Sequence, residues 1–211
     1  MIAVVCAVPA ERRALADLEG PGVAIHVSGI GADAAARAGA RVAAGPPRCL
    51  VAAGFCGALA DDLRVGDLVV AERVRDEASG ETLECDPELV AAAPGRRGTL
   101  VSSPRLARTA ADRARLDGLA VDMESAALAR AAAAAGIPFL ALRAVTDETR
   151  HRLPDFDALT DAAGRLTPGA GLLHFVRHPS EIPALIRLGP AARTAGRSLR
   201  AGLSILLERA R

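Results

Sequence analysis

Two carboxylates in the middle of the chain stand where a predicted helix begins and a predicted strand ends. Glu124 opens the alanine-rich segment 124–135, which favours a helix, and Asp147 follows an apolar run that starts at Pro138. In an open α/β sheet, ligands bind outside the carboxyl ends of the strands, so an acid directly after a buried strand points to a site. Carboxylates can act there as general acid or base. The pattern predicts an enzyme.

A third acid, Glu11, follows the first apolar run, residues 2–8, and lies two residues after Pro9, which suits the first turn of a helix. Further strand-length runs alternate with helix-prone segments along the chain. The other predicted strands are 23–28, 49–53, 68–74, 99–102 and 138–145, and the other predicted helices are 32–44, 104–116 and 124–135.

This alternation predicts an α/β fold, a three-layer α/β/α sandwich with a central, mostly parallel, twisted sheet. Residues 80–98 carry turn and polar residues without clear periodicity, and we expect them to form a surface excursion or flap. The length of 211 residues, with 51% hydrophobic and 24% charged residues, is typical of a globular protein. We therefore expect one domain over residues 1–211.

The composition excludes several functions. All 26 basic residues are arginine, so no lysine is available for a Schiff base or for a Walker-type phosphate loop. Asn, Gln, Tyr and Trp are absent too, so hydrogen bonds to a bound base must come mostly from backbone groups, carboxylates and hydroxyls. No apolar run reaches the roughly 20 residues of a membrane span, and the N-terminus lacks a signal-peptide pattern. We expect a cytoplasmic protein.

The cysteines and histidines give no metal signal. The four cysteines form no CxxC pair and are expected to be reduced structural thiols. His174 and His178 are four residues apart, as zinc ligands can be, but histidines near a helix C-terminus explain the spacing sufficiently. We expect no metal and no cofactor.

Two spaced motifs carry a family resemblance: V-D-M-E-S-A-A from Val121, and P-F-L-A-L-R-A-V-T-D ending at Asp147. Together with the runs 28–31, 53–59 and 65–67, in order along about the first 150 residues, they make the sequence resemble the nucleoside phosphorylase family, which includes the methylthioadenosine and adenosylhomocysteine nucleosidases. The resemblance implies that family's fold and cleavage of the N-glycosidic bond of a small-molecule purine nucleoside.

The resemblance also implies roles for the three acids. Asp147 matches the general acid at N7 of the purine, for which burial or a nearby negative charge must keep it protonated near neutral pH. Glu124, with the backbone of Met123, matches the position that binds the ribose hydroxyls. Glu11 matches the glutamate that deprotonates water in the nucleosidase branch, which favours hydrolysis. Three arginines are available if phosphate is the nucleophile instead: Arg12, Arg64 and Arg143.

Each acid also has a structural interpretation. Glu124 could complement a helix dipole, Asp147 could cap the next segment, and Glu11 could be an exposed helix-start residue. The catalytic interpretation requires the three to converge on one bound nucleoside, with none held in an unrelated ion pair.

Six further residues complete the expected substrate-binding set. The glycine-containing turns after strands permit close approach of the backbone to a ligand. The six residues are Gly31, Gly54, Phe55, Ser102, Ser103 and Thr146. Phe55 could instead be a residue of the hydrophobic core. Pro104 and Leu106 stand where nucleosidases usually carry an aspartate and an aromatic that stacks on adenine, which argues against methylthioadenosine as the substrate.

The C-terminal segment 174–211 is basic, with seven arginines against Glu181 and Glu208. From Phe175 onward it resembles the hopanoid-associated phosphorylase branch, whose members are linked to adenine release from adenosylhopane. An amphipathic basic segment could touch a membrane surface, or it could pack as a helix on the core or on a second subunit. It lacks the lysine clusters and interleaved aromatics of a nucleic-acid binder.

The sequence therefore predicts hydrolytic adenine release from a 5′-substituted adenosine such as adenosylhopane, by a homo-oligomer, most simply a dimer. Three alternatives stay open: a methylthioadenosine or adenosylhomocysteine nucleosidase, a phosphate-dependent phosphorylase, and a non-catalytic nucleoside-binding protein.

Overall fold

The structure is a computed structural model that describes residues 1–153 and 182–210. His174, His178 and the first part of the predicted basic segment lie outside the described residues. The strands are β1 (Ile2–Cys6), β2 (Val23–Val27), β3 (Cys49–Ala58), β4 (Leu68–Asp76), β5 (Thr82–Glu84), β6 (Arg96–Ser102), β7 (Ala120–Asp122) and β8 (Phe139–Asp147). The helices are α1 (Pro9–Leu15), η1 (Ala16–Leu18), α2 (Ala32–Ala43), α3 (Pro87–Ala92), α4 (Ala110–Arg113), α5 (Ser125–Ala134) and α7 (Ile182–Arg209).

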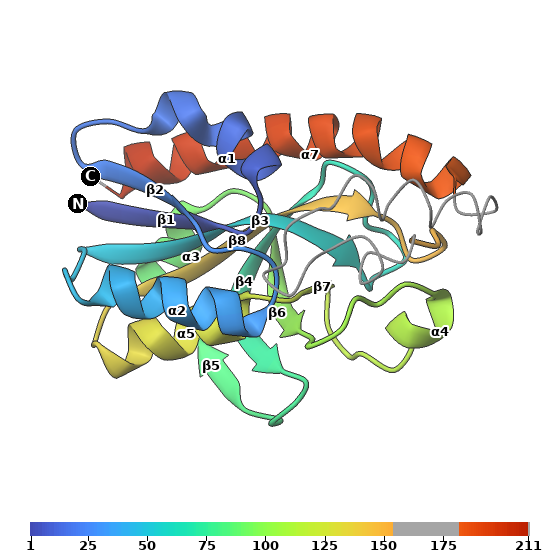
Figure 1. Ribbon diagram of the computed structural model, residues 1–211, viewed down its shortest axis with the longest axis horizontal. Helices are drawn as coiled ribbons and strands as arrows, with labels where there is room; N and C mark the ends of the chain where they lie inside the picture. The colour runs from blue at the N-terminus through green and yellow to red at the C-terminus, as the bar shows by residue number, and fades with distance from the viewer. Residues whose placement is uncertain (154–181, 211) are drawn as a thin grey trace.

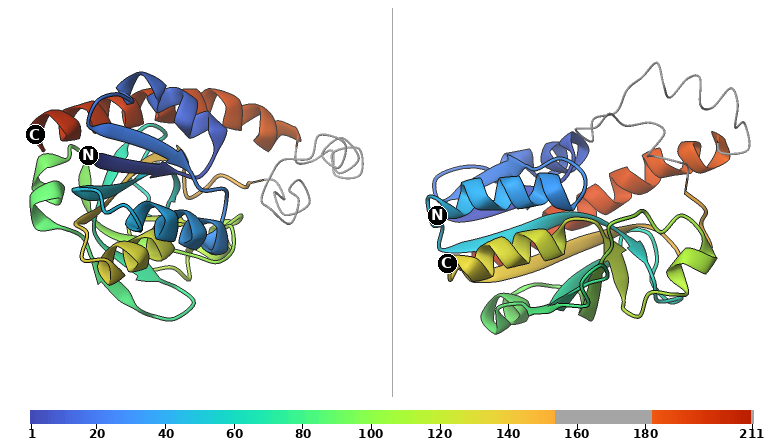
Figure 2. Two further views of the ribbon diagram at one scale, coloured as in Figure 1. Left: turned by 60° about the vertical axis from the view of Figure 1, so that its left-hand side comes forward. Right: turned by 60° about the horizontal axis from the view of Figure 1, so that its bottom comes forward.

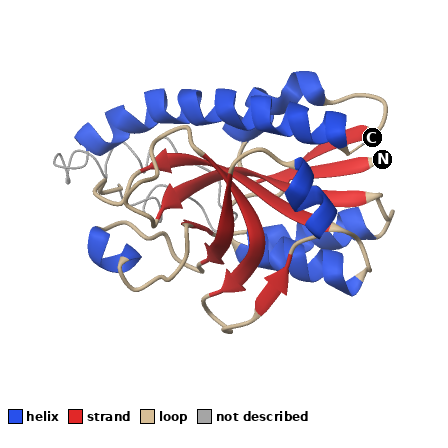
Figure 3. Cartoon of the chain, turned by 180° about the vertical axis from the view of Figure 1, so that it is seen from behind, coloured by secondary structure: helices blue, strands red, loops and turns tan. Residues whose placement is uncertain are grey.

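The strands form one mixed sheet in which most pairings are parallel. The order runs β2-β1-β3-β7-β6-β4-β5, and β8 pairs in parallel with β3 and antiparallel with β4. Because β3 also pairs with β7, the strands β3, β7, β6, β4 and β8 close into a ring. The strands fan out and twist strongly when the sheet is viewed from behind (Figure 3).

Helices cover both faces of the sheet, as Figures 1 and 2 show. Helices α1 and α7 pack together on one face, and α2 packs against α5 on the other. The innermost strands, β1, β3 and β8, are buried along nearly their whole length, which fits their almost continuous apolar sequences. The expected three-layer α/β/α architecture is confirmed.

Four details of the predicted elements were wrong. Residues 80–98 are not a flap, because they contain β5, α3 and the start of β6, and Leu89 and Val90 are buried in the core. The helix expected over 104–116 is limited to α4, since the reciprocal hydrogen bonds of Thr109 and Asp112 start it late. Strand β3 runs on to Ala58, and the three-residue β7 was not predicted.

Helix α7 packs on the core through one apolar face. Leu199, Leu203 and Leu206, at helical spacing, are at most 1% exposed, and the helix contacts β8 and α1. At Gly202 an added methyl group would lie 2.6 Å from Leu68, so the glycine lets the helix approach β4 closely. Core packing is thus one role of the C-terminal segment. Among the described helices, α7 included, none is both long and apolar enough to traverse a bilayer.

Replacing Leu203 with alanine should lower the free energy of unfolding by about 2–5 kcal/mol, because it removes a fully buried side chain and leaves a cavity. Urea titration followed by circular dichroism measures the change. Ile186→Ala is the matched control, since Ile186 is 68% exposed, and it should change stability by less than about 0.5 kcal/mol. Equal effects of the two substitutions would contradict the packing of α7 on the core.

Candidate active site

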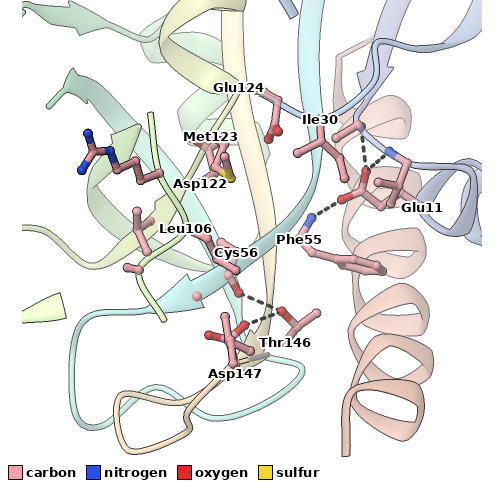
Figure 4. Close-up of a pocket in the computed structure, with 17 residues that line it drawn as sticks. Glu11, Ile30, Phe55, Cys56, Leu106, Asp122, Met123, Glu124, Thr146 and Asp147 are labelled. Atoms are coloured by element: carbon pink, nitrogen blue, oxygen red, sulfur yellow. Dashed lines mark hydrogen bonds between the residues drawn. The ribbon is translucent and has the colours of Figure 1, made fainter. Parts of the chain in front are cut away.

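A cavity of about 190 Å³ lies at the carboxyl ends of β1, β3, β7 and β8 (Figure 4). This is the edge of an α/β sheet where ligands bind, because the connecting loops diverge there. Four carboxylates line it, and they come from α1, from the end of β7, from the start of α5 and from the end of β8: Glu11, Asp122, Glu124 and Asp147. Apolar side chains supply much of the remaining wall: Val8, Ile30, Phe55, Leu106, Val121 and Leu153.

Glu11 is held by backbone N–H groups. Its Oε2 accepts from Ala7 (2.7 Å) and Val8 (3.0 Å), and its Oε1 accepts from Phe55 (2.7 Å). Burial raises the pKa of Glu11, while Arg143 and these donors oppose the rise. A carboxylate offers about four acceptor sites, so one is left for a further donor such as water. Glu11 is only 3% exposed, so the interpretation as an exposed helix-start glutamate is wrong.

Arg143 lies beside Glu11 under the backbone of Gly54. A methyl group added at Gly54 would lie 2.7 Å from Glu11 Oε1 and closer still to Arg143 Nη1, so the two side chains can approach only because residue 54 is glycine. Arg143 Nη2 pairs with Asp122 Oδ2 at 2.5 Å and donates to Ser125 Oγ at 2.8 Å. Burial lowers the pKa of Arg143, but the surrounding carboxylates outweigh it and hold the pKa above its ordinary value.

Glu124 directly precedes α5, but its side chain makes no hydrogen bond to that helix. Its Oε1 accepts a hydrogen bond from the N–H of Gly31 (2.8 Å), and no side-chain cap on α5 is formed. Gly31 has φ of +90°, a conformation that side chains disfavour, and this lets its N–H reach Glu124. The hydrogen bond to Gly31 is a contact that the helix-dipole interpretation does not account for. Burial, and then the charge of Asp122, raise the pKa of Glu124 to about 7.

Asp147 ends β8 beside a β-bulge. Pairing of β3 with β8 skips Thr146, so that Gly57 pairs with Asp147 and both Thr146 and Asp147 line the cavity. Asp147 Oδ1 accepts from the Thr146 hydroxyl (2.8 Å), and Oδ2 forms an ion pair with Arg113 Nη2 at 2.5 Å. Burial raises the pKa of Asp147, and Arg113 opposes that rise most strongly.

The structure thus brings Glu11, Glu124 and Asp147 to one cavity, but Asp147 is not free of an ion pair as the sequence interpretation required. Its contacts with Arg113 and Thr146 use about two of its four acceptor sites, so the carboxyl group can still contact a ligand in the cavity it lines.

The remaining predicted binding residues are placed differently from one another. Met123, Phe55 and Thr146 line the cavity, while Gly54 and Gly31 lie behind Glu11 and Glu124 and support them. Ser102 and Ser103 are not brought into the cavity lining. Ser102 is buried at the end of β6, and the hydroxyl of Ser103 donates to the carbonyl of Arg105, because the chain turns there toward Leu106.

Sequence reasoning missed Asp122, Ser125 and Arg113. Asp122 and Ser125 stand within the same short motif as Glu124, so alternation along β7 could have pointed to Asp122 as a second inward acid. Nothing in the sequence around Arg113 distinguishes it from the many other arginines, since its importance arises from contacts with residues far away in the chain.

The cavity contains groups for proton transfer and for hydrogen bonding to a polar ligand. Arg12 and Arg64 face the surface, where Arg12 pairs with Glu19 and Arg64 donates hydrogen bonds to the carbonyls of Asp61 and Leu63.

Cys56 also lines the cavity, and burial raises its pKa, so it is not an activated nucleophile. All four cysteines are buried and unpaired.

Residues 6–167 match the Phosphorylase superfamily, and the chain belongs to that family. It is 28% identical over 152 residues to the 5′-methylthioadenosine/S-adenosylhomocysteine nucleosidase of Aeromonas salmonicida, covering 56% of this chain and 65% of that protein. It is 35% identical over 156 residues to the futalosine hydrolase of Streptomyces coelicolor, covering 58% and 66%. The matched part thus spans just under two thirds of each relative.

Two solved structures show the same fold. The futalosine hydrolase of Helicobacter pylori superposes with a TM-score of 0.74 at 15% identity, over 98% of this chain and 97% of that chain. The S-adenosylhomocysteine nucleosidase of Streptococcus pyogenes gives 0.74 at 21% identity, over 98% and 95%. The mixed sheet and its covering helices are therefore those of this fold.

The raised pKa of Glu124 should make stability depend on pH. With a pKa of about 7 in the folded state and an ordinary value when unfolded, the folded state binds the extra proton between these values, so stability falls as pH rises through about 7. Glu124→Gln cannot titrate. From pH 5 to pH 8 its free energy of unfolding should therefore rise relative to the native protein by about 1–3 kcal/mol.

Urea unfolding at four pH values measures this difference, with Glu88→Gln on the surface of α3 as the control substitution. Parallel pH curves for the native protein and the Glu124 variant would show that residue 124 does not titrate as stated.

Proposed function

We propose that this protein is an N-ribosyl hydrolase that cleaves the N-glycosidic bond of a purine nucleoside. The observation that carries the proposal is the convergence of Glu11, Glu124 and Asp147 on one cavity at the carboxyl ends of the strands. Membership of the Phosphorylase superfamily and the similarity to two nucleoside-cleaving relatives support it.

The three acids divide the work of the reaction. The transition state resembles an oxocarbenium ion, so positive charge develops on the ribose, and negative charge on the leaving base must be neutralised. Asp147 hydrogen-bonds or protonates N7 of the base, Glu124 accepts the ribose hydroxyls near the developing charge, and Glu11 removes a proton from the attacking water through its remaining acceptor site.

The charges of the cavity favour water over phosphate as the nucleophile. Of the three arginines available for phosphate, Arg12 and Arg64 lie outside the cavity, and Arg143 is buried against Asp122. A phosphate about 4 Å from one carboxylate would pay on the order of 4 kcal/mol per charge pair at an effective dielectric near 20. In the part of the chain that the structure describes, four carboxylates line this cavity against one arginine, Arg105, so phosphate would meet more repulsion than attraction.

The substrate we propose is a 5′-substituted adenosine with a large apolar group, such as adenosylhopane, from which adenine is released. The apolar part of the wall supports such a substituent, with Val8, Ile30 and Leu153 among its side chains. The similarity to futalosine hydrolase makes futalosine a second candidate substrate.

We further propose that the protein is a cytoplasmic homodimer, which size-exclusion chromatography would test. The arginine-rich α7 permits contact with a membrane surface, and sedimentation with vesicles would test that contact.

Product analysis with and without phosphate tests the reaction type. We expect free base and free sugar to appear at the same rate in both conditions, and to appear faster from a 5′-alkyl adenosine than from methylthioadenosine, adenosylhomocysteine or futalosine. Sugar phosphate formed only in the presence of phosphate would overturn hydrolysis, and a faster rate on one of the other nucleosides would reassign the substrate.

Substitution of the acids tests their roles. Asp147→Asn and Glu11→Gln should each lower kcat by about 10²–10⁴-fold, because each removes a proton-transfer group, while nucleoside binding measured by calorimetry should persist. Glu88→Gln on the protein surface is the control for charge removal and should retain full kcat. Binding without turnover in the native protein would instead identify a non-catalytic nucleoside-binding protein.

A further inference from the structure

We propose that Arg113 is a positioning residue for base release, because it fixes the carboxyl group of Asp147 in the cavity wall. This inference rests on the proposed function, and it concerns a residue outside the motifs that suggested that function.

The guanidinium of Arg113 is buried, and all three of its nitrogens donate hydrogen bonds. Its side chain is 2% exposed, and Nη2 contacts Asp147 Oδ2 at 2.5 Å. Nε donates to the carbonyl of Ala107 (3.1 Å), and Nη1 donates to the carbonyls of Glu148 (2.8 Å) and Ala58 (3.3 Å). A planar guanidinium held at three corners cannot rotate, so its orientation toward Asp147 is set by the fold.

The carbonyls that hold Arg113 belong to three segments of the site. Ala107 follows Leu106 in the cavity wall, Ala58 ends β3, and Glu148 follows Asp147 after β8. One side chain therefore links the loop before α4 to the ends of two adjacent strands. Breaking this link would loosen the cavity wall as well as release Asp147.

The backbone around Asp147 is built to accept this arrangement. A methyl group added at Gly57 would lie 2.8 Å from Asp147 Oδ2, so the carboxylate packs directly against the glycine backbone of β3. The bulge at Thr146 brings the Thr146 hydroxyl to Oδ1. Each carboxylate oxygen thus has one fixed donor, and the remaining acceptor sites of the group are available to a base.

The charge of Arg113 opposes the effect of burial on Asp147. Within the described residues, the groups around Asp147 include Arg113 from α4, Thr146 from β8, the thiol of Cys56 from β3 and His151 from the segment after β8. Two more arginines, Arg152 and Arg187 of α7, line a second cavity together with Asp147. Burial raises the pKa of Asp147, and Arg113 lowers it more than the other groups do. Without Arg113 the carboxyl group would therefore keep its proton to higher pH.

The experiment compares three proteins: the native chain, Arg113→Met, which removes the charge at similar length, and Arg113→Lys, which keeps the charge without the planar fork. The dependence of kcat on pH is measured with the best nucleoside, and thermal unfolding is followed by circular dichroism. The carboxyl carbon of Asp147 is titrated by ¹³C NMR, with Asp147→Asn to assign its signal.

We expect Arg113→Met to lower kcat near neutral pH about 10–100-fold and to move both the alkaline limb of kcat and the NMR titration of Asp147 upward by about 1–3 pH units. Arg113→Lys should lower kcat but keep the alkaline limb of its pH dependence within about half a pH unit of that of the native protein. If the methionine variant unfolds, Arg113→Gln replaces it. If that variant also unfolds, native kcat in the lysine variant overturns the proposal.

A purely structural role would lower the unfolding temperature of Arg113→Met and leave the limb and the NMR titration where they are in the native protein, and that result would overturn the inference. Failure of the proposed function is a different outcome: the native protein would release no base from any nucleoside, while the NMR titration would still report whether Arg113 acts on Asp147.

Discussion

The buried guanidinium of Arg143 is the group on which the candidate site depends. It stands in the middle of β8 with 1% of its surface exposed, where an unpaired cation would be prohibitively unfavourable. Its pairing with Asp122 and its contact with Ser125 tie β8 to the end of β7 and the start of α5. Glu124 lies between those two residues in the chain, so the position of the ribose-binding candidate follows from how Arg143 is compensated.

The same requirement explains why the acids of the cavity are held in two different ways. Asp122 and Asp147 each have a buried guanidinium beside them, from Arg143 and Arg113. The other two acids, Glu11 and Glu124, rely on backbone N–H groups. The N–H of Gly31 reaches Glu124 from a backbone conformation that favours glycine, and the missing side chain of Gly54 leaves room for Glu11 and Arg143, which accounts for glycine at both positions. The positions of the four carboxyl groups are therefore set by the fold rather than by mobile surface residues.

The sequence predicted the architecture and the three acids because both depend on local patterns. Apolar runs of strand length and helix-prone segments between them identify an α/β sandwich, and an acid after such a run lies at the ligand-binding edge. The elements that the sequence did not predict depend on contacts with distant parts of the chain. Helix α3 is buried by α7 and β8, and β7 is a strand only because β3 and β6 flank it. Arg113 was not predicted for the same reason: its partners Asp147 and Ala58 are 34 and 55 residues away along the chain.

The ring formed by β3, β7, β6, β4 and β8 has a consequence for how copies of the protein behave at high concentration. A strand with an unpaired edge can recruit a strand of another molecule, and this is a common route to aggregation. Within the described residues, the strand order ends at β2 and β5, of five and three residues. The edge of β5 is short, whereas β2 has the length of an ordinary strand. Closure of the ring that builds the cavity therefore directs edge-to-edge joining with a neighbouring molecule chiefly to β2.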